Sequence, residues 1–264
     1  MNATPASTSR KSAAIGWSFF IGSAGLVAGL LLLGWDHPWF GILALLVVGG
    51  VAIPALRAKQ RFRQLMMLGE LDSLLALWTE QTKGHASQLD PLFKATAQLS
   101  FGLTERAEHS LRFVRTQALS QGDKEAAIEI DEQLLFVRAV LAAFEGENDR
   151  ASEHVEQLNH LPLPGSRWTR GKAITLRRAA AALVRAFAEG GNKKDVSWLR
   201  MAARQNPLVV WPMHYAEAVI QLQLGELDRT RHLLKETPEW PPDSVFRSFD
   251  RELNTKMQQI GAAA

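Results

Sequence analysis

The pentapeptide LGELD occurs at Leu68–Asp72 and again at Leu224–Asp228, and a near-copy, FEGEND, lies at Phe144–Asp149. On either side of these phrases apolar residues recur three and four positions apart, which is typical of amphipathic helices. Glycine adopts the left-handed backbone angles that end a helix, and an acid shortly after it can cap the next helix or lie at its positive end. The phrase therefore predicts the bend of a repeated helix–turn–helix unit.

The glycines that fit such bends recur at regular distances along the chain. The four successive intervals are 33, 44, 45 and 34 residues. Two of them match the 34-residue period of one class of helical repeat, and the other two contain about ten extra residues. The extra residues fall in the segments SQGDKE and LPLPGSRW. The five glycines are Gly69, Gly102, Gly146, Gly191 and Gly225.

Between Gln60 and Pro238 the chain resembles the tetratricopeptide-repeat family. The segments GENDRA (Gly146–Ala151) and GLTERA (Gly102–Ala107) keep the glycine and the alanine of the family phrase Gly-Asp-x-x-x-Ala at the family's separation. Other units depart from the pattern, because larger residues replace the small alanine. The alternative is an irregular helical domain. The replacing residues are Leu74, Val196 and Thr230.

The resemblance implies an all-α fold, with a solenoid of helical repeats over residues 57–240. A stack of repeats exposes apolar surface at its ends, which terminal helices cover. The segment PPDSVFRSFDRELNTKMQQI begins with a helix-start signal and carries an apolar stripe. We therefore expect a capping helix and tail in residues 241–264.

Two long uncharged runs precede the repeats. Residues 12–35 and 38–56 contain no charged side chain, and as helices they would span roughly 36 and 28 Å. A bilayer core is about 30 Å thick, so each run is long enough to cross it. A secretory signal peptide is the rival interpretation of the first run, but that run is too long and a second one follows immediately. We expect a short cytoplasmic tail (1–11) and a transmembrane hairpin (12–56).

Cations flank the hairpin on one side only. The positive-inside rule therefore places both chain ends in the cytoplasm, and we expect a bacterial inner-membrane protein. The cations that follow the second run predict a collar on lipid headgroups, and they are Arg57, Lys59, Arg61 and Arg63. The remaining chain carries 28 bases (30 minus 2) and 26 acids (27 minus 1), so its charge gives no reason to expect nucleic acid.

Gly25 and Gly29 are spaced for close approach of a neighbouring membrane helix. This approach fits packing within the hairpin, and it also fits lateral association with another copy or another membrane protein. Homo-oligomerisation stays open.

The sequence contains no recognisable catalytic or cofactor-binding motif. It has no cysteine, and its seven histidines form no H-E-x-x-H pattern. We therefore expect no enzyme, no metal and no cofactor.

In a tetratricopeptide stack the first helix of each unit lines a concave groove. The family's ligand-facing positions, counted back from each turn glycine, fall here on Arg178, Arg185, Gln133, Phe136 and Tyr215. The two arginines with the aromatic rings would suit an acidic or C-terminal peptide segment. The alternative is that the two arginines are ordinary solvated residues or partners of nearby acids.

Two functions fit these patterns. The first is a membrane-anchored scaffold or adaptor that binds a protein partner on the cytoplasmic side, for assembly or quality control of a membrane complex. The second is a structural or accessory subunit of a membrane protein complex that associates through its hairpin.

Overall fold

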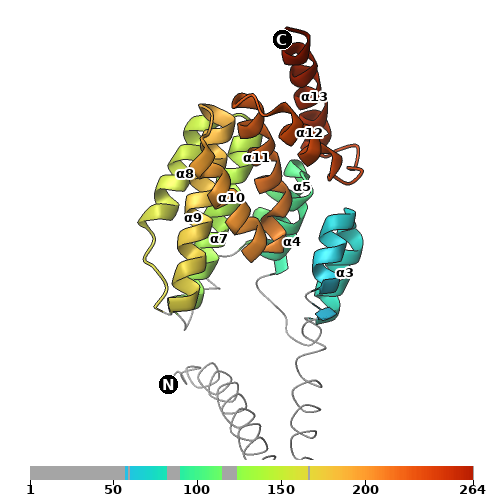
Figure 1. Ribbon diagram of the computed structural model, residues 1–264. Helices are drawn as coiled ribbons and strands as arrows, with labels where there is room; N and C mark the ends of the chain where they lie inside the picture. Colours follow the sequence, from blue (N-terminus) through green and yellow to red (C-terminus); the bar gives the residue numbers. More distant parts are fainter. Residues whose placement is uncertain (1–56, 59, 82–89, 115–123, 166, 264) are drawn as a thin grey trace, which may run out of the picture. The chain divides into compact units, whose positions relative to one another are not determined.

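The computed structural model describes residues 57–58, 60–81, 90–114, 124–165 and 167–263, and all its regular elements are helices (Figure 1). The chain divides into two compact units, 1–63 and 64–264. No helix of the described residues is long and apolar enough to cross a membrane, and the runs 12–35 and 38–56 lie outside them.

The second unit consists of paired helices followed by a single long one. The backbone is helical over 60–68, and the later helices are α3 (Leu71–Gln81), α4 (Asp90–Ser100), α5 (Thr104–Leu111), α7 (Lys124–Phe144), α8 (Asn148–His160), α9 (Arg167–Ala188), α10 (Lys193–Gln205), α11 (Val210–Gln223), α12 (Leu227–Lys235) and α13 (Val245–Ala263), with a 3-10 turn, η1, at Pro207–Val209.

Four of the expected glycine bends share one backbone geometry. The glycine has a φ between +70° and +77°, and the residue after it donates its N–H to the carbonyl five residues back, at 2.8–3.1 Å. This pattern satisfies carbonyl groups that the end of a helix would otherwise leave unpaired. The prediction of helix–turn–helix bends is confirmed at Gly69, Gly102, Gly146 and Gly225.

The acids that follow the bends at Gly146 and Gly225 do not cap the next helix. The residues at the N-cap positions of α8 and α12 are Glu147 and Glu226, and neither makes a side-chain capping bond. Asp149 and Asp228 lie in the first turn instead. There a carboxylate interacts favourably with the positive end of the helix dipole.

The bend after α9 differs from the sequence prediction. Gly190, and not Gly191, has the left-handed φ, at +92°. Gly191 is required for another reason, because a Cβ there would lie 2.4 Å from the side chain of Ile220. The next helix starts with a capping box, in which Asn192 accepts from the N–H of Asp195 and Asp195 accepts from the N–H of Asn192.

The first helices of four pairs contact one another in a closed order. The helix α4 packs on α7, α7 on α9, α9 on α11, and α11 on α4 again. We call these four helices the first-helix cycle. Their partners α5, α8, α10 and α12 each pack on a member of the cycle, and Figure 1 shows α9 between α8 and α10.

Hydrogen bonds between distant segments close the cycle and join it to the two ends of the unit. The indole N–H of Trp211, at the start of α11, donates to the carbonyl of Met66 at 2.8 Å. The Ser100 hydroxyl donates to the carbonyl of Leu208. The N–H of Val245 donates to the carbonyl of Gly102 at 2.9 Å, which joins α13 to the bend after α4. The two ends of the unit are thus fastened to each other.

The last helix, α13, lies over an aromatic cluster. Its Phe246 stacks on Tyr215 of α11, with ring centroids 4.4 Å apart. Its Phe249 contacts Phe144 and Phe187, the aromatic residues at the ends of α7 and α9. Burial of such rings is a large source of stability. The expected apolar stripe of α13 is thus buried over its first part, whereas Ile260 is 41% exposed.

Candidate functional site

Three of the five residues predicted to line a groove have their side chains in the interior of the second unit. Phe136 and Tyr215 are buried, and Gln133 donates from its side-chain amide to the Thr96 hydroxyl at 3.0 Å. They belong to α7 and α11, and the repeat pattern predicts them on the concave side of the stack. That side is closed here, because α11 returns to α4 and the side chains fill the interior.

Tyr215 has a specific structural role. Its hydroxyl donates to Asp250 of α13 at 2.7 Å and accepts from the indole N–H of Trp240 at 2.7 Å. Burial raises the pKa of the Tyr215 hydroxyl and also the pKa of the Asp250 carboxyl. The network fastens α13 to α11.

Arg178 and Arg185 are exposed on the outer side of α9, toward α10. The Arg178 guanidinium lies 4.5 Å from the ring centroid of Trp198. The Arg185 guanidinium pairs with the buried carboxylate of Asp195, at 2.5 Å. Both arginines are therefore oriented by α10 and do not meet Gln133, Phe136 or Tyr215 in one groove.

The one-residue shift of the bend explains this position. Counted from Gly190 instead of Gly191, the family's ligand-facing positions on α9 move to Arg177 and Val184, which are both buried. One residue corresponds to about 100° around a helix. Arg178 and Arg185 consequently face solvent.

The membrane-related residues are only partly described. Arg57, Arg61 and Arg63 are exposed, so contact with lipid headgroups stays a prediction for them. Gly25, Gly29 and Lys59 lie outside the described residues.

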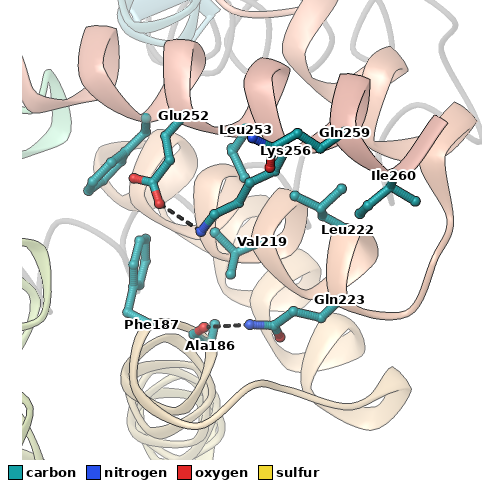
Figure 2. Close-up of a pocket in the computed structure, with 11 residues that line it drawn as sticks. Ala186, Phe187, Val219, Leu222, Gln223, Glu252, Leu253, Lys256, Gln259 and Ile260 are labelled. Carbon is teal, nitrogen blue, oxygen red and sulfur yellow. Dashed lines mark hydrogen bonds and ion pairs between the residues drawn. The ribbon is translucent and has the colours of Figure 1, made fainter. Parts of the chain in front are cut away.

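A pocket of about 420 Å³ lies between α9, α11 and α13, which we call the end pocket (Figure 2). Its walls are mostly apolar, with Phe187 from α9, Leu222 from α11 and Ile260 from α13. Sequence reasoning missed it, because it forms where three elements distant in sequence meet. The remaining lining residues are Ala186, Val219, Gln223, Phe249, Glu252, Leu253, Lys256 and Gln259.

Three of the four polar side chains that line the end pocket have partners. Lys256 pairs with Glu252 at 2.7 Å, and the amide of Gln223 donates to the carbonyl of Ala186 at 3.4 Å (Figure 2). These interactions neutralise the rim and leave the apolar side chains as the available contact surface. The pocket is therefore suited to an apolar group.

Comparison with known proteins adds no relative. No family model, curated protein or solved structure matches this chain.

Proposed function

We propose that this protein is a membrane-anchored scaffold or adaptor whose cytoplasmic part binds a protein partner, for assembly or quality control of a membrane complex. In this proposal the runs 12–35 and 38–56 form a transmembrane hairpin in the bacterial inner membrane. The helical pairs are degenerate tetratricopeptide-like repeats, and α13 caps them.

The end pocket is the observation that carries the proposal. Function depends on a site and not on a fold, and this pocket offers apolar walls with a neutralised rim. Ile260 is 41% exposed at its edge, although α13 buries its other large apolar residues more fully. An apolar side chain of a partner protein would cover this surface and gain free energy by leaving water.

The test is mass spectrometry of the proteins that copurify with the full chain from gently solubilised membranes. We expect Ile260→Glu to lose a companion, because it places a charge at the apolar wall. Leu163→Glu is the matched control, since Leu163 is 43% exposed on the loop before α9 and does not line the pocket. The control should retain the companion.

A deletion of residues 57–264 separates the adaptor from a membrane subunit. A companion lost with the deletion supports binding by the cytoplasmic part. The same companions retained by residues 1–56 alone would overturn the proposal and place the function in the membrane segment.

A further inference from the structure

Four arginines lie in one row along the outer side of α9. They occupy positions at intervals of three, eight and seven residues, which return to the same side of a helix. All four are exposed, and the residues between them on this side, Ile174 and Ala181, are half-buried. The row extends over about 27 Å at 1.5 Å per residue. We call Arg167, Arg170, Arg178 and Arg185 the arginine row.

The charged side chains of α9 are all positive. The helix contains six basic residues and no acid. Arg167 and Arg170 lie in its first turns, where the positive end of the helix dipole opposes a cation by about 0.3–1 kcal/mol. These positions therefore do not stabilise the isolated helix, and a bound anion would relieve the repulsion.

The row is largely free of internal ion pairs. In the described part of the chain, the ion pairs of α9 involve Arg177 and Arg185 but not Arg167, Arg170 or Arg178. Arg170 makes a single long bond, from Nε to the carbonyl of Pro164 at 3.3 Å. Most of the guanidinium donors remain available for carboxylates, which they can bind with two parallel hydrogen bonds.

The walls on the two sides of the row differ in character. On the α10 side, the Arg178 guanidinium lies over the ring of Trp198, and Met201 is 41% exposed. On the α8 side, a hollow of about 270 Å³ lies between α8 and α9, with Val155 and Glu156 among its lining residues. Glu156 is exposed, and Arg185 of the row lines the same hollow.

This asymmetry favours a polypeptide over a uniform polyanion. A nucleic acid or an anionic lipid surface would present its charges to Glu156 as well as to the row, and like charges repel. A polypeptide can place carboxylates on the arginines and neutral side chains beside α8. Its apolar side chains can contact Met201 and the hollow.

We propose that the arginine row is the contact surface for an acidic segment of the protein partner. The inference rests on the proposed adaptor function and names the chemistry of its client. About nine extended residues would cover the length of the row.

The probe is a fluorescein-labelled peptide of about twelve alternating Glu and Ala residues. Its binding is measured by anisotropy to the full chain in nanodiscs of zwitterionic lipid, so that anionic headgroups do not compete. We expect binding that weakens as salt is raised, because exposed charges are screened. The matching Lys–Ala peptide should not bind.

The decisive variant combines Arg167→Gln, Arg170→Gln and Arg178→Gln. We expect its Kd for the acidic peptide to rise about tenfold or more, since three charge-assisted contacts are lost. Arg185 is left in place, because its removal would leave the buried Asp195 carboxylate unpaired. The matched control combines Arg204→Gln, Arg247→Gln and Arg251→Gln, three exposed arginines on α10 and α13, and should bind as the wild type does.

Equal binding by the two triple variants would overturn the inference. It would also be overturned if vesicles rich in phosphatidylserine, or a single-stranded oligonucleotide, displaced the peptide and bound more tightly through the same three arginines. The copurification experiment separates the adaptor proposal from the inference about the arginine row. If the row variant keeps its copurifying companion while Ile260→Glu loses it, the adaptor stands and the row does not.

Discussion

Single residues at the glycine bends differ in how much they tolerate a side chain. Gly102 and Gly146 have nearly the same φ, +70° and +75°. A Cβ at Gly102 would lie 2.6 Å from the Ser244 hydroxyl and 2.9 Å from the Phe246 ring, whereas a Cβ at Gly146 would meet nothing within 4 Å. The two positions therefore separate backbone strain from a packing overlap.

We predict that Gly146→Ala lowers the free energy of unfolding by about 1 kcal/mol, from the left-handed backbone alone. Gly102→Ala should cost about 2–4 kcal/mol, because the overlap with α13 adds to that strain. Urea denaturation of the two variants measures the difference. Equal losses would mean that Ser244 and Phe246 move aside without cost.

At the scale of elements, one buried ion pair joins α7, α9 and the loop between α8 and α9. Arg177 donates to Glu132 at 2.7 Å and to the carbonyls of Leu161 and Pro162 at 2.7 and 3.0 Å. Both charged residues are buried. Removal of one partner leaves an uncompensated charge in the interior.

We therefore predict that Glu132→Ala lowers the free energy of unfolding by about 3–5 kcal/mol. Glu108→Ala is the control, because its pair with Arg112 is exposed, and it should cost less than about 1 kcal/mol. Thermal or urea unfolding of both variants provides the measurement. Similar small losses would show that water reaches Arg177 after the substitution.

The contact between α11 and α12 should respond to pH through His214. Its ring nitrogen Nε2 lies 2.7 Å from the Leu233 carbonyl. Burial lowers the pKa of His214 below its ordinary value of 6.5, although the hydrogen bond to Leu233 and the charges of Glu217, Glu236 and Asp250 oppose the shift. As pH falls through 6.5 the unfolded chain takes up a proton before the folded chain does. Stability is therefore lost on acidification below this value.

We predict that His214→Gln, which keeps a donor for Leu233, reduces the loss of stability between pH 7.5 and pH 5.5. Urea denaturation of wild type and variant at the two pH values tests this. The same dependence in both proteins would assign the effect to other groups.

The elements themselves were largely predictable from sequence, because they depend on local signals. The helical periodicity and four of the glycine bends are visible in the sequence. The sequence places the bend after α9 one residue late, since two adjacent glycines carry the same signal and only the backbone geometry shows which of them has the left-handed φ. The spacing of Arg167, Arg170, Arg178 and Arg185 was also visible in the sequence, but it acquires meaning only when the outer side of α9 is known.

At the scale of the whole second unit, the closed first-helix cycle could not be inferred from the repeats. The pattern of an open stack places Phe136 and Tyr215 on an accessible concave side. Contacts between residues more than 100 positions apart, such as the hydrogen bond from Ser100 of α4 to the carbonyl of Leu208 just before α11, close that side. Such long-range contacts leave no local signature in a sequence, and they determine which predicted site residues reach solvent.

Closure also changes how the unit should unfold. In an open solenoid each repeat contacts only its neighbours, so terminal repeats can unfold separately. Here α11 and α13 hold α4 and the bend after it. We predict that Trp211→Phe, which replaces the buried indole by a smaller ring and leaves the Met66 carbonyl without its donor, lowers the free energy of unfolding by about 1–3 kcal/mol.

The distinguishing measurement is amide hydrogen exchange of the full chain. In a cooperative unit, amides of α4, α9 and α11 that exchange through global unfolding should accelerate by the same factor in Trp211→Phe, about tenfold for each 1.4 kcal/mol lost. Acceleration confined to the segment from α11 to α13, with α4 unchanged, would contradict the cycle. In that case the second unit would behave as an open stack, and Phe136 of α7 would become accessible when α11 and α13 unfold locally.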